Sequence, residues 1–552
     1  MRGSIPRPDD PVRTRRRADP AGSGTPVLDW PRDRCRHPPP GPVRPRRRSP
    51  ARRSRRDHGP HVRGADPSTG ETLVDLPRSS ADDVRDAVSR ARLAQVAWAR
   101  VGFAERRRVL LRAFDLILER REDLLDLTQL ESGKTRGQAF EEVFQALSVT
   151  RWNALKARSV LRGGVRRSGI PVALSTRVKY KSKGVVGVVT PWNYAISLAA
   201  MDVVPALAAG CAVVQKADDQ GALSVLALRR AFIDAGVPEA LWAVVAGEPG
   251  EVGEALTDEV DYICFTGSTA TGRRIAEKAG RRLVGASLEL GGKNALIVLD
   301  DVDVEQAAAD AAHACFSSMG QLCVSIERIY VHRTVAEAFT AALVARLTDP
   351  RIGSGLDHEA DYGSLASAAQ LARITGHLDD ALAQGAEVLV GGRPRPDVGP
   401  WAFEPTILAG VTPGMRVLDE ETFGAIASLQ VFDDELEAVF AANDSEYGLN
   451  ASVLSGSTRH ALRVADLLEA GSVNVNEGYR GSFSSVDAPM GGVKSSGLGR
   501  RNGREGLLRF ADPVTVSVNT RIIPLPHTGR EYRTMIPLMA LLQRVFRGIR
   551  RA

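Results

Sequence analysis

The chain lacks a long hydrophobic run and a cysteine framework. No stretch of about 18 uncharged apolar residues occurs in its 552 residues, so we expect no transmembrane helix. Its five cysteines lie far apart and form no Cys-x-x-Cys pair, which disfavours both a disulfide framework and a cysteine-based zinc site. We therefore expect a cytoplasmic protein without a bound metal ion, whose cysteines are single thiols.

Lysine is absent from the first 63 residues, and acidic residues are scarce there. This segment holds 18 Arg, six Asp and 13 Pro, so it carries +12 against a total of +7 and leaves −5 for the rest of the chain. It has neither the apolar period of a helix or strand nor the apolar core of a secretory signal. We interpret residues 1–63 as a disordered Arg/Pro-rich extension. The alternative is an arm that binds an anionic surface or nucleic acid, but the acidic body is not expected to bind nucleic acid.

Strands and helices alternate in the remainder of the chain. A valine-rich strand over residues 183–190 is followed by an expected helix over 197–209, and the next strand and helix are expected over 211–215 and 222–235. This order predicts an α/β fold with a parallel sheet of Rossmann type. A second alternation begins after about residue 290 and predicts a second α/β domain.

Cys323 differs from the other cysteines in its local sequence. It closes the segment 320–323, Gly-Gln-Leu-Cys, whose first two residues predict a turn rather than the interior of a helix or strand. A thiol on such a turn can be exposed and have its pKa lowered, as nucleophilic attack requires. The alternative is ordinary packing of a lone cysteine in the core.

Two further side chains could take part in such chemistry. Glu289 stands at an expected strand end and begins the segment 289–293, Glu-Leu-Gly-Gly-Lys, so its carboxylate could project into a cleft and activate water. We expect burial to raise its pKa for that role, although the segment could be a plain turn. Asn193 follows another strand and could either cap a helix or donate its amide to an oxyanion.

Two segments are candidates for binding a dinucleotide. Gly267 and Ser268 follow a strand and open a helix, where small residues and a hydroxyl suit a pyrophosphate. Lys216 and Asp219 follow the strand expected over 211–215 and could contact an adenosine ribose. The first segment is not Gly-x-Gly-x-x-Gly, and the charges of the second could simply be solvated in a loop.

The order and spacing of these motifs resemble the aldehyde dehydrogenase superfamily. The resemblance continues through segment 421–424 (Glu-Thr-Phe-Gly), segment 447–449 (Tyr-Gly-Leu) and segment 488–500, and it covers roughly residues 64–520. Segment 323–331 and the Ala-Pro-Met-Gly-Gly stretch are most similar to a bacterial branch of succinate-semialdehyde dehydrogenases that use NAD or NADP.

The resemblance implies a role for each matching residue. Cys323 would attack the aldehyde carbon, Asn193 and the Cys323 backbone N–H would hold the oxyanion, and Glu289 would activate water to release the acid from a thioester. The hydride would pass to NAD or NADP. The coenzyme contacts that the resemblance implies are Trp192, Asn193, Lys216, Asp219, Gly267, Ser268, Leu290, Glu421 and Phe423.

The resemblance also implies the domain organisation and the assembly. We expect a dinucleotide-binding domain over residues 64–288, with a β oligomerisation hairpin near 171–183, and a catalytic domain over 289–500. An oligomerisation strand over 501–520 would serve a homodimer or homotetramer. The remaining segment, 521–552, reads as a basic tail that packs on the body or on a neighbouring subunit, or that touches a membrane surface as an amphipathic helix.

This sequence departs from the pattern of the family at positions that decide specificity. Asp219 stands where the family usually has Glu, and an acid there favours NAD by repelling a 2′-phosphate, whereas the similar branch is linked to NADP. Two arginines that bind the substrate carboxylate in succinate-semialdehyde dehydrogenases are replaced by Met201 and Ser317. A carboxylate needs a compensating cation, and Arg480 is our candidate, although it could equally be a solvated loop charge.

Three alternatives for the activity follow from the same residues. The substrate could be another aliphatic or aromatic aldehyde. CoA could also replace water as the acceptor of the acyl group, but the presence of Glu289 to activate water argues against CoA. A non-enzymatic scaffold with an Arg-rich nucleic-acid-binding arm is disfavoured by the intact Cys, Glu and Asn set. Ser325 occupies the place where some of these enzymes carry a second cysteine, so we expect no local redox switch.

Overall fold

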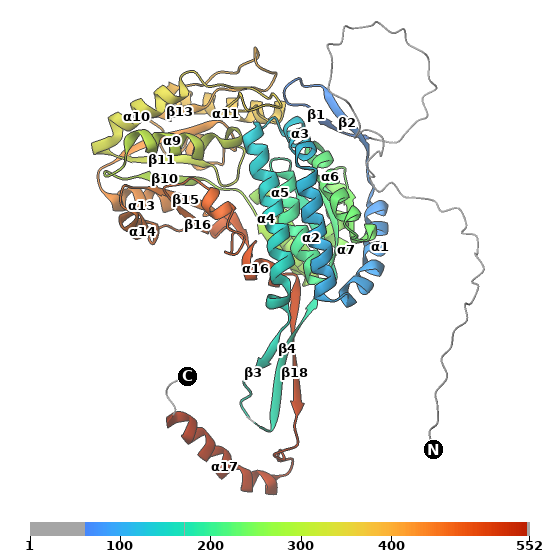
Figure 1. Ribbon diagram of the computed structural model, residues 1–552. Coiled ribbons are helices and arrows are strands. Elements are labelled where there is room, and N and C mark those ends of the chain that lie inside the picture. Colours follow the sequence, from blue (N-terminus) through green and yellow to red (C-terminus); the bar gives the residue numbers. More distant parts are fainter. Residues whose placement is uncertain (1–60, 171, 549–552) are drawn as a thin grey trace, which may run out of the picture.

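The computed structural model describes residues 61–170 and 172–548 (Figure 1). Most of the predicted extension, residues 1–60, therefore lies outside the described residues. His61–Ala65 form strand β1, which pairs antiparallel with β2 (Thr72–Pro77), so the last residues of the predicted extension belong to a strand.

A six-stranded sheet forms the centre of the first α/β unit. Its strand order is β17-β9-β8-β5-β6-β7, and all neighbours are parallel except β17 and β9. This is the Rossmann-type sheet that the alternating sequence predicts. Its strands are β5 (Val185–Thr190), β6 (Ala212–Ala217), β7 (Trp242–Val245), β8 (Tyr262–Thr266), β9 (Gly285–Glu289) and β17 (Gly497–Leu498).

Helices cover this sheet, and one of them is buried on all sides. All the side chains of α5 (Ala195–Ala209) are buried, since the helix lies between the sheet and α4 and carries almost no polar residue. The helices of this unit are α1 (Ala81–Arg100), α2 (Phe103–Glu119), α3 (Arg121–Ser132), α4 (Arg136–Leu161), α5, α6 (Ala222–Asp234), α7 (Glu254–Glu259), α8 (Thr269–Arg282) and α16 (Gly503–Leu508).

A seven-stranded sheet forms the second α/β unit, as the second alternation predicts. Its order is β12-β13-β14-β11-β10-β15-β16, and only β12 runs antiparallel to its neighbour. The strands are β10 (Asn294–Val298), β11 (Ile326–His332), β12 (Glu387–Val390), β13 (Thr406–Ala409), β14 (Ile426–Phe432), β15 (Asn450–Leu454) and β16 (Ser472–Val475). The helices are α9 (Val304–Phe316), α10 (Arg333–Leu347), α11 (Ala368–Ala383), α12 (Arg416–Asp419), α13 (Glu435–Asn443), α14 (Thr458–Ala465) and α15 (Arg480–Phe483).

A small antiparallel sheet projects from the body (Figure 1). It consists of β3 (Gly164–Arg166), β4 (Leu174–Ser182) and β18 (Ala511–Asn519), in the order β18-β4-β3. In place of the hairpin expected near 171–183, this segment contributes one strand, β4. It pairs with β3 on one side and with the C-terminal β18 on the other. This sheet matches the position expected for an oligomerisation element, which remains a prediction.

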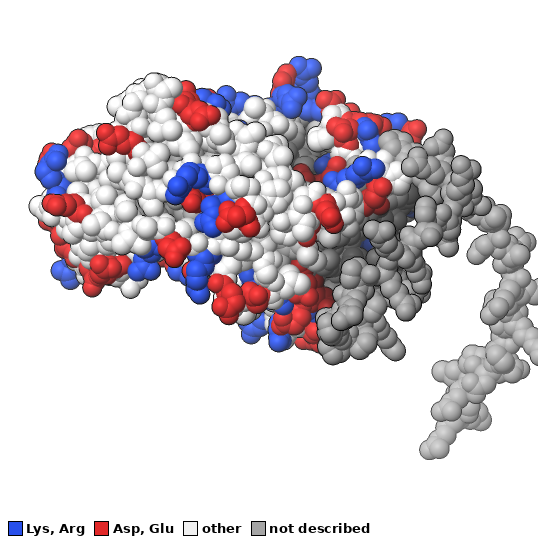
Figure 2. Space-filling model, turned by 90° about the horizontal axis from the view of Figure 1, so that it is seen from above, with Lys and Arg blue, Asp and Glu red and all other residues white. Residues whose placement is uncertain are grey.

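The outer surface carries charges of both signs. On the face shown in Figure 2, acidic and basic side chains are interspersed in small groups, so this face offers no extended basic surface for a nucleic-acid backbone. Beyond β18 the chain continues into α17 (Gly529–Gly548). Among the described residues, no helix combines the length and apolar character that crossing a bilayer requires.

Candidate active site

The predicted site residues gather where parallel strands of the first sheet end. Asn193 follows the end of β5, Ser268 follows the end of β8, and Leu290 follows the end of β9. Lys216 is the last residue but one of β6. Ligands of doubly wound α/β folds bind at this edge of the sheet.

One cavity joins residues from both α/β units. It has a volume of about 250 Å³ and is lined by Cys323, Glu289 and Asn193 together with Glu421 and Phe423. Trp192, Gly267, Ser268 and Leu290 also line it. The structure thus brings together the predicted nucleophile, the predicted base and the predicted oxyanion donor, although they lie far apart in the sequence.

The turn before Cys323 has an unusual backbone. Ser318 and Met319 have φ values of 50° and 57°, a region that side chains other than glycine seldom adopt. Hydrogen bonds hold this conformation, since Tyr194 Oη lies 3.0 Å from Ser318 Oγ and Gln321 Nε2 donates to the Ser318 carbonyl at 3.0 Å. The turn is therefore fixed from α5 as well as from its own chain.

The environment of the Cys323 thiol differs from our expectation of a lowered pKa. Its desolvation in the cavity, together with the nearby carboxyls of Glu289 and Glu421, raises the pKa of Cys323 to about 12. The prediction of a lowered pKa was wrong because a turn in the sequence does not reveal that this turn is buried or that two acids face it. The thiol itself is half-buried and reaches the cavity.

Glu289 is buried at the end of β9, as expected for a general base. Its Oε1 has no hydrogen-bond partner among the described residues. Desolvation raises the pKa of Glu289 to about 7, although the buried Arg501 opposes the shift. Three residues later, a Cβ at Gly292 would lie 2.7 Å from the Cys323 carbonyl oxygen, so only glycine allows the two segments to approach this closely.

Asn193 is held in place by a hydrogen bond to the cysteine turn. Its Nδ2 donates to the Gln321 carbonyl at 2.9 Å, and the residue is 5% exposed. A primary amide has two N–H groups, so one remains to donate to a substrate oxygen. The alternative role of Asn193 as a helix cap is not seen. The cap residue of α5 is Tyr194, and its side chain forms no capping hydrogen bond.

The segment of Glu421 and Phe423 is held by residues that the sequence did not reveal. Glu327 accepts the backbone N–H of Thr422 at 2.9 Å and that of Phe423 at 2.8 Å, and it forms a buried ion pair with Lys293. Phe423 has a φ of 57°, so its backbone needs such support.

Two side chains of α11 hold the carbonyl side of the same segment. Gln370 donates to the Phe423 carbonyl, and Arg373 donates to the carbonyls of Glu421 and Thr422. Nothing in the local sequence of α11 or β11 points to these contacts, which exist only because the two segments pack together.

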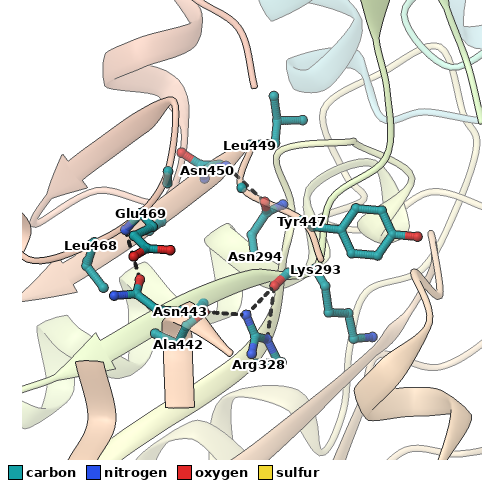
Figure 3. Close-up of a pocket in the computed structure, with 14 residues that line it drawn as sticks. Lys293, Asn294, Arg328, Ala442, Asn443, Tyr447, Leu449, Asn450, Leu468 and Glu469 are labelled. Carbon is teal, nitrogen blue, oxygen red and sulfur yellow. Dashed lines mark hydrogen bonds between the residues drawn. The ribbon is translucent and has the colours of Figure 1, made fainter. Parts of the chain in front are cut away.

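Figure 3 shows a small cavity behind the segment that follows Glu289. Its volume is about 20 Å³, and Arg328 crosses it to donate to the carbonyls of Lys293 and Ala442. Asn294 accepts the backbone N–H of Asn450 and donates to the Cys323 carbonyl at 2.8 Å. This cavity is too small for a substrate, and its residues fix the backbone on which the site is built.

A second groove continues the cavity toward β6. Its volume is about 330 Å³, and it shares Trp192, Thr266 and Gly267 with the first cavity. Lys216 lines this groove, but Asp218 lines it in place of the predicted Asp219.

Asp219 lies beside the groove rather than in its wall. Its Oδ1 accepts the Gly247 backbone N–H at 3.2 Å and lies 4.0 Å from Lys216 Nζ. Its carboxylate can therefore act on a ligand in the groove through its charge, whereas Asp218 lines the groove itself.

The predicted substrate cation is not part of this cavity. Arg480 opens the short helix α15, and its guanidinium pairs with Glu477 at 2.8 Å. It is about half exposed and lines neither the cavity of Cys323 nor the adjoining groove. Met201 and Ser317 stand at the two positions where succinate-semialdehyde dehydrogenases carry arginine. Both are buried and uncharged, so neither position supplies a cation.

Known proteins resemble the chain over most of its length. The model of the family described as "Aldehyde dehydrogenase family" matches residues 55–516. A Mycobacterium ulcerans protein named a putative NADP(+) succinate-semialdehyde dehydrogenase is 47% identical over 449 residues, 81% of this chain and 87% of the relative. One of that name from Mycolicibacterium smegmatis is 44% identical over 482 residues, 86% of this chain and 93% of the relative.

Solved structures agree with these relatives. An Escherichia coli NADP-dependent enzyme has a TM-score of 0.80 at 35% identity and covers 84% of this chain and 95% of its own. The NAD+ complex of betaine aldehyde dehydrogenase from Staphylococcus aureus has a TM-score of 0.81 at 31% identity and covers 85% and 94%. The resemblance drawn from the motifs is confirmed, and the chain belongs to the aldehyde dehydrogenase family.

Proposed function

We propose that this protein oxidises succinate semialdehyde to succinate with NAD+ or NADP+ as the hydride acceptor. The observation that supports the chemistry is the cavity that Cys323, Glu289 and Asn193 line together, continuous with a groove at the carboxyl edge of a Rossmann-type sheet. The choice of substrate is supported by the names of the mycobacterial relatives.

The residues along the groove fit a dinucleotide. The N-terminus of α8, capped by Ser268, can receive a pyrophosphate, and Lys216 can bind a ribose hydroxyl. The half-buried Glu421 and the Phe423 ring stand at the inner end, where a nicotinamide ribose and its ring would lie. The coenzyme, when bound, supplies the hydride acceptor.

The first covalent step forms a thiohemiacetal on Cys323. The sulfur bonds to the aldehyde carbon, and the carbonyl π electrons move to oxygen, where the free N–H of Asn193 stabilises the negative charge. Because the thiol has a raised pKa, its proton must be taken up as the bond forms. Glu289 lines the same cavity and is the base available there.

The second half of the reaction releases the acid. Once the substrate carbon has lost hydride, the acyl group is a thioester of Cys323. Glu289 first releases to solvent the proton that it took from the thiol, and it then takes a proton from water as the hydroxide adds to the acyl carbon. The carbon–sulfur bond breaks to free the acid, and the departing sulfur takes the proton back from Glu289, which restores the thiol. A buried carboxylate with a pKa of about 7 suits this role and favours water over CoA as the acceptor.

The charges at the outer end of the groove do not select a single coenzyme. Lys216, Arg274 and Lys278 line it with Asp218, and Asp219 stands nearby. The cations suit a 2′-phosphate and the acids oppose it. We therefore retain both NAD+ and NADP+, as the differing coenzymes named for the relatives also suggest.

Steady-state kinetics would test the substrate. We expect kcat/KM for succinate semialdehyde to exceed that for neutral aldehydes of similar length, with either coenzyme. If Arg480 binds the carboxylate after leaving Glu477, Arg480→Ala will raise KM for succinate semialdehyde much more than KM for a neutral aldehyde. The matched control is Arg459→Ala, an exposed arginine on α14. Equal activity on neutral aldehydes would contradict the proposed substrate, and an unselective effect at Arg480 would remove that residue alone.

We also propose that the projecting sheet joins subunits into a homodimer or homotetramer. Most side chains of β18 are exposed, and Val518 on its outer part is 56% exposed. An exposed strand with apolar side chains is a site for pairing with another chain. Light scattering of the purified protein would give the number of subunits, and a monomer would contradict the proposal.

A further inference from the structure

The C-terminal helix α17 leaves the body of the molecule with its side chains uncovered. It follows the projecting strand β18 and lies beyond the end of that sheet (Figure 1). Every side chain described on it is exposed or half-buried, including Ile536 at 58% and Leu541 at 55%. The packing against the body that the sequence suggested is therefore not seen.

The arginines of α17 lie on one side of the helix, and most of its apolar side chains lie on the other. At about 100° per residue, the four arginines fall within one arc of roughly 100°. These are Arg530, Arg533, Arg544 and Arg547. The wide arc that remains also holds Glu531 and Thr534, near the start of the helix. Most of its described side chains are apolar, namely Tyr532, Met535, Ile536, Leu538, Met539, Leu541 and Leu542.

The arginine arc has no anionic partner in the described part of the chain. None of its four guanidinium groups forms an ion pair with a described residue, whereas many arginines of the body do. The helix carries one acid, Glu531, whose carboxylate already accepts the backbone N–H groups of His527 and Thr528. The four guanidinium groups are therefore free to bind an external source of negative charge.

Pro537 shows which side of α17 faces a polar medium. It lies inside the helix and within the arginine arc, and it has no N–H to donate to the carbonyl four residues earlier. That carbonyl needs water or another polar donor, which a helix buried on this side would deny it. The arginine arc thus suits a wet, anionic boundary, and the opposite arc suits an apolar one.

We propose that α17 lies in the surface of an anionic lipid bilayer. The arginines would contact lipid phosphates, and the apolar arc would enter the boundary of the acyl chains. The helix would lie in the surface rather than cross it. A second copy of the chain is a poorer occupant, because the apolar arc is wider than a helix–helix seam and a partner α17 brings no free acid to the arginines. This proposal does not depend on the proposed function.

Sedimentation of the full-length protein with lipid vesicles tests this directly. We expect it to bind vesicles of phosphatidylcholine with phosphatidylglycerol, and to bind vesicles of phosphatidylcholine alone at least tenfold more weakly. Replacing all four arginines of the arc by Gln should weaken binding to the anionic vesicles at least tenfold, with oxidation of aldehyde unchanged. The matched control replaces four exposed arginines of the body by Gln, namely Arg107, Arg151, Arg158 and Arg459.

The control separates α17 from the Arg-rich N-terminal segment, which is the same in every variant. Equal vesicle binding by the arc variant and the control would overturn the proposal. So would loss of oligomers in the arc variant, since α17 would then serve a second copy. A Leu538→Trp variant reports insertion, because its fluorescence should shift to shorter wavelength only with anionic vesicles. An unshifted spectrum with bound vesicles would show that the apolar arc stays outside the membrane and would also contradict the proposal.

Discussion

The two ends of the coenzyme groove are built on different physical principles. At the inner end, Glu289 and Glu421 are desolvated and each has its pKa raised to about 7. At the outer end, Lys216 is accompanied by Asp218 and Asp219, which are both partly exposed. Charges act strongly where water is excluded and weakly where it is not.

This difference orders the expected effects of substitution. The inner cavity is lined by a single thiol, Cys323, and its two carboxylates, Glu289 and Glu421, stand on separate segments of the chain. At the outer end several charges of both signs share the same region. We therefore expect single changes to abolish chemistry at one end and only to shift preference at the other.

The largest effect is expected for the nucleophile. Cys323→Ala should lower kcat by ~10⁴-fold or more, since no other thiol lines the cavity and the covalent route is lost. Coenzyme binding should be retained, which fluorescence titration would check. Cys315→Ala is the matched control, a buried cysteine outside the cavity that should remain active. Normal turnover of the Cys323→Ala protein would contradict the whole mechanism.

Replacement of the base should come next. Glu289→Gln should slow thioester hydrolysis by ~10²- to 10⁴-fold, while the first hydride transfer appears as a burst of reduced coenzyme. Since the pKa of Glu289 is about 7, its carboxylate is protonated and inactive below that pH, and turnover of the native protein should rise as the pH passes through about 7.

The pH profile separates a base from a structural role. Glu289→Gln should lose the rise near pH 7, whereas a variant that merely loosens the site would keep it at a lower rate. Glu420→Gln, an exposed carboxylate next to the coenzyme-binding segment, is the control and should keep both rate and profile. An unchanged rise in the Glu289→Gln protein would show that another group is the base.

The same comparison explains what could be predicted from the sequence. Local patterns were sufficient for α6, which is expected over residues 222–235 and found over Ala222–Asp234, and for the helix that Ser268 caps. They also placed Cys323, Glu289 and Asn193 on segments that follow strands or turns. These features depend on neighbours in the sequence, so they are visible in it.

Features that depend on packing could not be read in this way. The raised pKa of Cys323 arises from desolvation in the cavity and from acids 34 residues before it and in segment 421–424, and a turn motif carries no information about either. The contact of Glu327 with the segment of Phe423 joins two neighbouring strands of the second sheet. The groove is lined by Asp218 and not by the predicted Asp219. This outcome depends on how the 3₁₀ turn orients the two carboxylates, which the sequence does not show.

An intermediate effect is expected for Glu327, which holds the segment of Glu421 at the inner end. Glu327→Gln removes one acceptor for two backbone N–H groups and leaves Lys293 without its buried counter-charge, so the segment of Glu421 should become mobile. We expect KM for the coenzyme to rise by roughly tenfold or more. The thiol reactivity of Cys323 toward iodoacetamide should change little. A fall in kcat with unchanged coenzyme KM would assign Glu327 a different role, and Glu420→Gln again serves as control.

The smallest effect is expected at the outer end of the groove. Replacing Asp218 and Asp219 together by Ser removes two negative charges beside Lys216 and should favour a coenzyme that carries a 2′-phosphate. Because both acids are partly exposed and water screens them, the ratio of kcat/KM for NADP+ to that for NAD+ should rise only ~3- to 10-fold. Glu277→Gln, on the outer surface of α8, removes one charge without lining the groove and should leave the ratio unchanged. A change of several hundredfold would show that this end is as desolvated as the inner one and that the contrast between the two ends does not hold.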